Sequence, residues 1–164
     1  MIDWVMKKNK LIQVEELKVN DLVPNPIIIK SNLLKEEINE YALKQLILNR
    51  LDDFLTQLGS GFTYVGNEFK IKLKDRYNYI DLLLYNIKYK CYVVVELKTT
   101  ELKKEHAGQI MIYMNYIDKN IKTIEENKTV GIIICKKDNK YVIEFCSDER
   151  IISREYELVQ IWKK

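Results

Sequence analysis

Two short, almost continuously apolar segments near the middle of the chain constrain its fold more than any other feature. They span residues 79–85 and 91–98, and both are rich in β-branched and aromatic residues. Such segments are too short for typical helices but suit strands that are covered on both faces of a sheet. Only a few residues separate them, so we expect them to pair antiparallel through a tight connection at Lys88 and Tyr89.

Helices are predicted on both sides of these two strands. Asn32 is a candidate helix N-cap, and after it apolar residues recur at helical spacing as far as Leu58, with Gly59 as the helix end. A second amphipathic pattern runs from about residue 103 to residue 118, with apolar positions at Ala107, Ile110, Met111, Met114 and Ile117. Both patterns indicate helices that pack one face against a sheet.

Further apolar segments complete the predicted sheet. They are residues 62–65, 69–73, 130–135 and 141–146, followed by an extended tail through residues 156–158. Gly66-Asn67 is predicted as a two-residue hairpin turn, and Asp138-Asn139 as the turn between the last two strands. The expected fold class is therefore α/β, with a mixed central sheet flanked by helices.

The length of 164 residues suits one compact domain. Pro24 and Pro26 interrupt regular structure, so residues 1–30 are expected to form an N-terminal arm and residues 31–164 the main domain. Apolar residues make up 47% of the chain and charged residues 31%, which excludes a disordered or low-complexity chain. The net charge of +3 is too small to identify a nucleic-acid-binding protein on its own.

Membrane and secretory signals are missing from the sequence pattern. No apolar run approaches the length of a membrane-spanning helix, and the first residues lack a secretory signal. Cys91, Cys135 and Cys146 form an odd set without C-x-x-C spacing, which favours reduced thiols packed in strands over disulfides or a zinc site. We therefore expect a soluble cytoplasmic protein with no membrane partner.

Each of the two central strands contains one carboxylate, Asp81 in the first and Glu96 in the second. The tight connection sets a register that places Asp81 directly opposite Glu96 on one face of the sheet. Lys98 shares that face, and the Leu97 carbonyl lies near it. Two carboxylates this close repel unless a cation lies between them, and oxygen ligands suit Mg²⁺ or Mn²⁺. Alternatively, Lys98 alone neutralises one carboxylate and Asp81 lies at a sheet edge.

The second predicted helix places two polar residues near these carboxylates. Gln109 and Tyr113 are four residues apart, on a face distinct from the apolar stripe, and the helix starts a few residues after Lys98. Gln109 can therefore reach the carboxylate site. For Tyr113 alone, core packing with a hydrogen-bonded hydroxyl is the alternative role.

At this point the sequence resembles the PD-(D/E)xK nuclease superfamily and, within it, the YhcG-type nuclease-domain proteins. The matching stretches are FLTQLGSGFTYVGNEFKI, YIDLLLYNIKYKCYVVVELKT, EHAGQIMIYM and VGIIICKKDNKYVIEF. They occur in this order and cover roughly residues 37–158, so the combined match is far more specific than any single motif. The resemblance implies a restriction-endonuclease-like fold with an αβββαβ core.

The resemblance also implies metal-dependent hydrolysis of phosphodiester bonds. The family's motif residues fall on Asp81, Glu96, Lys98, Gln109 and Tyr113. Asp81, Glu96 and the Leu97 carbonyl are then expected to hold Mg²⁺ or Mn²⁺, and Lys98 to orient or activate the attacking water. Gln109 is expected to position Lys98 or a phosphate, and Tyr113 to support the helix against the site.

The chain departs from the family pattern at the motif strand, in the first helix, and at His106, which replaces an aromatic residue and is expected to be a solvent-facing residue without a catalytic role. Ile80 stands where the superfamily name has proline. Many relatives have a glutamate in the first helix that adds to the metal site, whereas this chain has Lys44 there and Glu40 one turn earlier.

The segment that contains the motif is locally basic. Between residues 70 and 104 there are nine Lys and Arg against four Asp and Glu. The candidate nucleic-acid-binding residues are Lys70, Lys72, Lys74, Lys103 and Lys104. The alternative for the first three is an ordinary solvated strand face, because lysines also protect exposed strands from aggregation.

The function expected from the sequence is a Mg²⁺-dependent DNA endonuclease that acts on structured or foreign DNA. The alternative is a catalytically inactive nucleic-acid-binding or assembly module that retains the nuclease fold. A third reading is a structural protein in which a one-residue register slip separates Asp81 from Glu96. Since many nucleases of this type act as dimers, a homodimer is the expectation for the oligomeric state.

Overall fold

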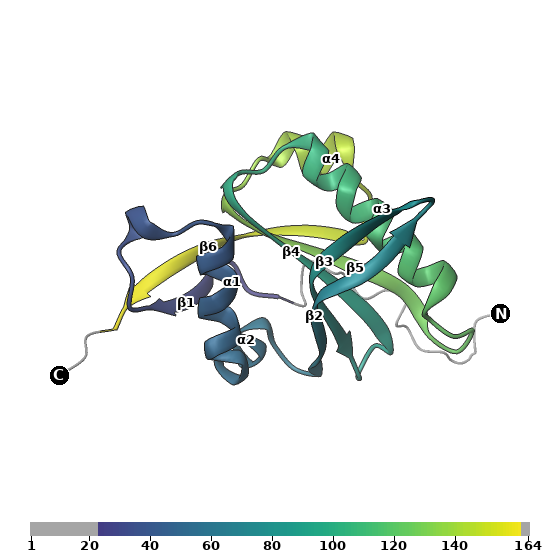
Figure 1. Ribbon diagram of the computed structural model, residues 1–164, viewed down its shortest axis with the longest axis horizontal. Helices are drawn as coiled ribbons and strands as arrows, with labels where there is room; N and C mark the ends of the chain where they lie inside the picture. Colours follow the sequence, from purple (N-terminus) through teal and green to yellow (C-terminus); the bar gives the residue numbers. More distant parts are fainter. Residues whose placement is uncertain (1–22, 162–164) are drawn as a thin grey trace.

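A computed structural model describes residues 23–161 of the chain. These residues form a six-stranded mixed sheet with helices on both faces (Figure 1). The strands are β1 (Ile27–Ser31), β2 (Phe62–Leu73), β3 (Arg76–Asn86), β4 (Cys91–Glu101), β5 (Asn127–Lys137) and β6 (Ile151–Gln160). Their order across the sheet is β1-β6-β5-β4-β3-β2.

The pairing directions divide the sheet into two parts. The β2–β3 and β3–β4 pairs are antiparallel, whereas the β4–β5, β5–β6 and β6–β1 pairs are parallel. Parallel neighbours need crossover connections, which are supplied by α3 (Lys104–Asn120) between β4 and β5 and by α4 (Lys140–Cys146) between β5 and β6. Between β1 and β2 lie a short 3₁₀ helix (Lys35–Glu37), α1 (Glu40–Asn49) and α2 (Leu51–Leu58). The αβββαβ core order is confirmed.

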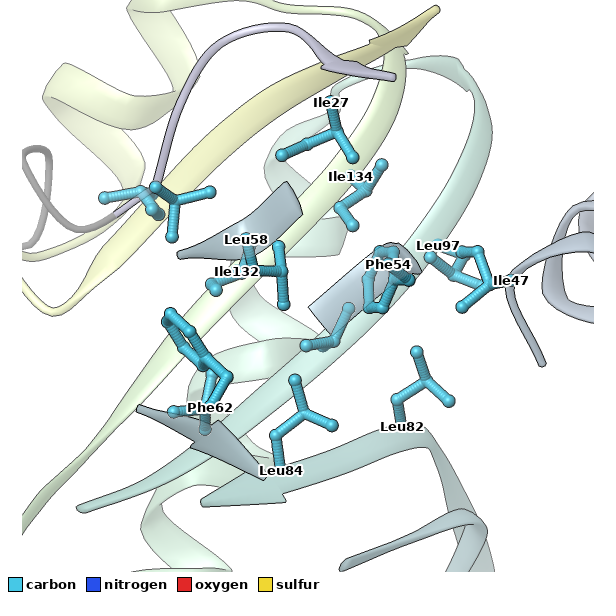
Figure 2. Packing of buried hydrophobic residues seen from close by; sticks show 14 of the residues in the cluster. Ile27, Ile47, Phe54, Leu58, Phe62, Leu82, Leu84, Leu97, Ile132 and Ile134 are labelled. Atoms are coloured by element: carbon cyan, nitrogen blue, oxygen red, sulfur yellow. The ribbon is translucent and has the colours of Figure 1, made fainter. Parts of the chain in front are cut away.

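Two hydrophobic clusters lie on opposite faces of the sheet. α1 and α2 cover one face, and Figure 2 shows how side chains from both helices pack against the strands there. The labelled residues of this cluster are Ile27, Ile47, Phe54, Leu58, Phe62, Leu82, Leu84, Leu97, Ile132 and Ile134. α3 covers the other face with the apolar stripe predicted for it, including Ala107, Ile110 and Met114. Since each face is covered, β3, β4 and β5 are apolar on both sides, which the sequence predicts for the segments of β3 and β4.

The first helical segment begins later than predicted and is divided in two. Its N-cap is Asn39, whose side-chain oxygen accepts a hydrogen bond from the Ala42 N–H at 2.8 Å, so the expected N-cap at Asn32 is wrong. The helix breaks at Arg50, whose φ of −134° and ψ of 54° are not helical. α2 ends at Gly59, as predicted, with a φ of 128°.

The predicted hairpin turn at Gly66-Asn67 is also wrong. β2 continues through both residues and contains an irregularity between Tyr64 and Gly66. Tyr64 and Gly66 pair with the consecutive residues Leu84 and Leu83, so β2 has one extra residue here, and an extra residue bends and twists a strand without ending it. The hairpin turns at Lys74 and Asp75 instead, and Lys74 has a φ of 58°.

The predicted strand over residues 141–146 is a helix, α4. The side chain of Asn139 caps it by accepting hydrogen bonds from the N–H groups of Tyr141 and Val142, at 3.1 and 3.4 Å. A short apolar segment suits either structure, and this cap favours the helix. Of the free cysteines, Cys91 and Cys135 are buried in strands as predicted, whereas Cys146 is exposed at the end of α4.

The N-terminal arm expected over residues 1–30 falls mostly outside the described residues. The last residues of that range, from Ile27, form β1, which pairs in parallel with β6 from the Ile27 and Tyr156 pair onward. These residues are therefore part of the sheet, and the extended tail predicted through residues 156–158 is confirmed as part of β6. No helix within residues 23–161 has the length and hydropathy needed to cross a membrane.

Candidate active site

The carboxylates of Asp81 and Glu96 meet where the β3–β4 ladder ends. The ladder runs from the Asn86 and Cys91 pair to the Leu82 and Val95 pair, so the register predicted from the tight connection is confirmed. One step further, the Asp81 N–H donates a hydrogen bond to Glu96 Oε2 at 3.0 Å. The Leu97 N–H donates to Asp81 Oδ2 at 2.9 Å. Side-chain oxygens thus replace backbone carbonyls as hydrogen-bond acceptors between the two strands. The one-residue register slip that would have separated Asp81 from Glu96 does not occur.

The two carboxylates differ in their exposure to solvent. Glu96 is 4% exposed, whereas Asp81 is only partly buried. Burial raises the pKa of Glu96 to about 8, and the neighbouring Asp81 charge adds to the shift. Burial also raises the pKa of Asp81, although the hydrogen bond from Leu97 and the charges of Lys44 and Lys98 oppose this shift. Without a cation, Glu96 therefore retains a proton near neutral pH.

Lys98 and Tyr113 lie near this pair, as predicted. The charge of Lys98 lowers the pKa of both Asp81 and Glu96, so its ammonium group acts on both carboxylates. Tyr113 is buried on α3, and burial together with the charges of Glu96 and Asp81 raises the pKa of its hydroxyl. Both strands and α3 therefore contribute to one site.

Gln109 is half-buried on α3, one turn before Tyr113. Within residues 23–161 it makes no hydrogen bond to Asp81, Glu96 or Lys98, so the predicted proximity is not a direct contact. Leu97 contributes its N–H to the site, while its side chain is buried in the cluster under α1 and α2.

The candidate nucleic-acid-binding lysines fall in two places. Lys70, Lys72 and Lys74 are exposed on the β2–β3 hairpin, and the residues that alternate with them pack toward the second cluster. Lys103 and Lys104 are exposed at the start of α3. The hairpin lysines lie on the strand next to Asp81, because Lys70 pairs with Tyr79 and Phe69 with Ile80.

Two charged residues join the site from elements whose geometry the sequence did not reveal. Lys44 of α1 forms ion pairs with Glu68 of β2 and with Asp81, where Nζ lies 4.0 Å from Oδ1. Glu68 stands across from Asp81, between the Asn67–Leu82 and Phe69–Ile80 pairs. The charge of Glu40, at the start of α1, raises the pKa of both Asp81 and Glu96. Glu68 could have been found from the pairing of β2 with β3, which places it across from Asp81. The wrongly predicted turn at Gly66-Asn67 ended the strand before this pairing could be recognised.

The donor set fits a hard divalent cation. One oxygen of each carboxylate, Asp81 Oδ2 and Glu96 Oε2, accepts a backbone hydrogen bond, so the second oxygen of each is left for a cation. The residues are all oxygen donors, which suits magnesium or manganese better than zinc. In the part of the chain that the structure describes, no group of three or more His, Cys, Asp or Glu side chains is arranged to hold a metal ion.

Comparison with known proteins gives a family match over most of the chain. The model of the family described as YhcG PDDEXK nuclease domain matches residues 20–161. The Escherichia coli (strain K12) protein named "Putative nuclease YhcG" is 28% identical over 113 residues, which are 69% of this chain and 30% of that protein. The match therefore spans less than a third of the length of this relative.

Two solved structures are also similar to the chain. A repair endonuclease from Pyrococcus abyssi superposes with a TM-score of 0.49 at 15% identity, covering 76% of this chain and 48% of the other. EndoMS in a complex with dsDNA superposes with a TM-score of 0.42 at 18% identity, covering 63% of this chain and 38% of the other.

Proposed function

This chain belongs to the YhcG PDDEXK nuclease domain family, and from that premise we propose that it is a divalent-metal-dependent endonuclease that hydrolyses phosphodiester bonds in DNA. The observation that supports this most is the pair of backbone hydrogen bonds that hold the two carboxylates together, from the Asp81 N–H to Glu96 Oε2 and from the Leu97 N–H to Asp81 Oδ2. A purely structural sheet has no use for a buried and a half-buried carboxylate side by side, because their repulsion and desolvation destabilise it. A site for a cation explains the arrangement.

Asp81 and Glu96, together with the Leu97 carbonyl, are the residues that would hold Mg²⁺ or Mn²⁺. The metal, when bound, supplies Lewis acidity toward a phosphoryl oxygen and lowers the pKa of water. Because the pKa of Glu96 is raised, this carboxyl group must release its proton before it can bind a cation. The proton equilibrium of Glu96 therefore makes metal binding weaker in acid.

Lys98 is the residue assigned to the reacting water and phosphate. Its ammonium group lies close enough to both carboxylates to shift their pKa values, so it can stabilise negative charge that develops on a phosphate held there. Tyr113, which is buried beside the carboxylates, supports α3 against the site. Gln109 is assigned to positioning a phosphate, since within the described residues it makes no hydrogen bond to either carboxylate.

The exposed face of the β2–β3 hairpin is the proposed path of the nucleic acid. Lys70 and Lys72 both lie over the ring of Tyr77, with their Nζ atoms 4.2 and 5.9 Å from its centroid. Tyr77 and Tyr79 are 55% and 48% exposed. Cations beside exposed aromatic rings suit phosphates and unpaired bases. Lys103 and Lys104, at the start of α3, are proposed as further phosphate contacts.

A plasmid-nicking assay with and without Mg²⁺ or Mn²⁺ tests this function. We expect metal-dependent nicking by the wild type and at least a roughly hundredfold slower reaction for Glu96→Gln and for Asp81→Asn, because each loses a charged metal ligand. Glu101→Gln, which neutralises an exposed acid at the end of the same strand, is the matched control and should cut normally. Linear product formed together with nicked plasmid would indicate two sites that act together, as in a homodimer.

The nearby cation at Lys44 favours a second candidate, a nucleic-acid-binding module without catalysis. Lys44 pairs with Asp81 from the helix in which many relatives have a glutamate. Salt-sensitive DNA binding by the wild type without nicking, under any divalent metal, would support this candidate and reject the endonuclease. Nicking that persists in Glu96→Gln would reject the assigned site.

A further inference from the structure

Lys44 is a charged residue in an environment that disfavours charge. It is 9% exposed, and its neighbours on α1, Leu43 and Ile47, belong to the hydrophobic cluster under that helix. A buried ammonium group needs partners of opposite charge. Lys44 has two, the carboxylates of Glu68 and Asp81, so its side chain is directed to the site at the end of the β3–β4 ladder.

Glu68 is held in place by an unusual backbone conformation. Its φ of 47° lies in the left-handed region, which residues other than glycine adopt rarely. The conformation follows the irregularity of β2 near Gly66 and precedes the regular Phe69–Ile80 pair. From this position the Glu68 carboxylate pairs with Lys44, whose ammonium group also pairs with Asp81 Oδ1.

The charges of the site balance for one divalent cation. Four carboxylates act on it, from Glu40, Glu68, Asp81 and Glu96, together with two ammonium groups, from Lys44 and Lys98. When all are ionised, four negative and two positive charges leave a net charge of −2. One Mg²⁺ or Mn²⁺ neutralises this charge, whereas a second would have to bind between Asp81 and Glu68, where the Lys44 ammonium group lies.

We propose that Lys44, held by Glu68, takes the place of a second metal ion and limits this site to a single divalent cation. The inference rests on the proposed function, because it concerns the metal that the endonuclease would use. Lys44 is then a positioning and charge-balancing residue, and Glu68 is the residue that orients it. Lys44 acts directly on Asp81 Oδ1, and Glu68 acts through Lys44.

Counting bound metal tests the proposal without requiring DNA. The wild type and Lys44→Met are titrated with MnCl₂ in a calorimeter, and free Mn²⁺ is followed by its paramagnetic resonance signal. We expect one ion per wild-type chain and two per Lys44→Met chain, because methionine retains the packing but removes the positive charge. Two ions in the wild type, no ion in the wild type, or the same count in both proteins would overturn the proposal.

Further variants separate charge from packing. Lys44→Arg keeps the positive charge and should bind one ion, and Lys119→Met, which removes an exposed lysine from the last turn of α3, should also bind one. Glu68→Gln should weaken the first ion about fivefold or more, because Lys44 then pairs with Asp81 alone. Two ions bound by Lys44→Arg, or unchanged affinity in Glu68→Gln, would contradict the assigned roles.

The nicking assay on the same proteins distinguishes the two proposals. A wild type that binds one ion, gains a second on Lys44→Met and never cuts DNA would reject the proposed function and keep this inference. A wild type that cuts DNA but binds the same number of metal ions as Lys44→Met would keep the proposed function and reject this inference.

Discussion

Asp81 and Glu96 illustrate how two like charges can be kept side by side inside a sheet. Each carboxylate accepts one hydrogen bond from a backbone N–H of the opposite strand. These N–H groups lie just beyond the end of the β3–β4 ladder, so the carboxylates replace the backbone acceptors that they would otherwise lack. The remaining repulsion is reduced by the proton on Glu96 and by Lys44 and Lys98. Without metal, the site is therefore more stable while that proton is bound, which makes its stability depend on pH.

The proton on Glu96 predicts how stability changes with pH when divalent metal is removed by EDTA. The pKa of this carboxyl group is raised from 4.5 to about 8 in the folded chain, so the folded state binds a proton that the unfolded state has released. Stability from this group is complete below the unfolded pKa and is lost as pH rises through the folded value. We expect the wild-type melting temperature to fall between about pH 5 and about pH 9.

Glu96→Gln is the matched variant for this measurement, because glutamine keeps the shape and cannot ionise. Its melting temperature should exceed that of the wild type by a few degrees at about pH 9, and the difference should disappear toward about pH 5. Thermal melts followed by circular dichroism give both curves. Parallel curves for the two proteins would show that Glu96 ionises normally in the folded state.

The sequence was sufficient to predict the central residues of this site but not the outer ones. A tight connection and period-two alternation determine that Asp81 faces Glu96, so local rules were enough. Glu68 depends on an irregular strand and a left-handed residue. Lys44 depends on how α1 packs against the sheet. These tertiary features leave little trace in residue spacing.

At the scale of elements, α3 packs closely against β5. Gly131 of β5 permits this approach, because a Cβ atom there would lie 2.6 Å from Met114 Sδ and 3.0 Å from Ile110 Cδ1. Both atoms are ends of flexible side chains, so alanine could be accommodated by a small shift. A branched side chain at this position could not, and it would move the helix.

Gly131→Val should therefore destabilise the protein by about 1–3 kcal/mol through overpacking. The free energy of unfolding from urea titration measures this effect. Gly108→Ala is the control on α3 itself, since nothing lies within 4 Å of its added Cβ, and it should stabilise the helix by about 0.5–1 kcal/mol. A Gly131→Val protein as stable as the wild type would show that α3 is free to move away from β5.

The elements themselves were predictable to different degrees. Long periodic segments such as α3 were confirmed because their amphipathic pattern admits one solution. The segment at 141–146 has too few residues to separate a strand from a helix, and the Asn139 side chain decides in favour of α4. The break at Arg50 has no glycine or proline to mark it, so the pattern from Leu43 to Leu58 suggested one continuous helix.

At the scale of the whole molecule, a net charge of only +3 means that the proposed nucleic-acid affinity must come from local clusters. The hairpin lysines form such a cluster on the outermost strand, β2, next to the carboxylate site. If they bind phosphates, their removal should change the salt dependence of binding and not only its strength.

The double variant Lys70→Gln and Lys72→Gln tests this. The slope of log binding constant against log salt concentration should decrease by about two for duplex DNA, one for each phosphate that a lysine no longer neutralises. Fluorescence anisotropy over a series of KCl concentrations gives the slope, and a single-stranded oligonucleotide in parallel reports whether Tyr77 and Tyr79 favour unpaired bases.

A double variant at Lys119 and Lys128, two exposed lysines elsewhere, removes the same total charge and should leave the slope unchanged. Equal slopes in all three proteins would identify the hairpin lysines as a solvated surface.

The strand order places β1 and β6 together at the sheet edge opposite β2. Because they run parallel, the chain enters this edge at one end, through Ile27, and leaves it at the other, after Gln160. Reporter domains or affinity tags fused to the described segment would thus be tethered on the side remote from the hairpin. Engineering that preserves this edge can change what the domain is attached to while sparing the opposite edge, where β2 lies.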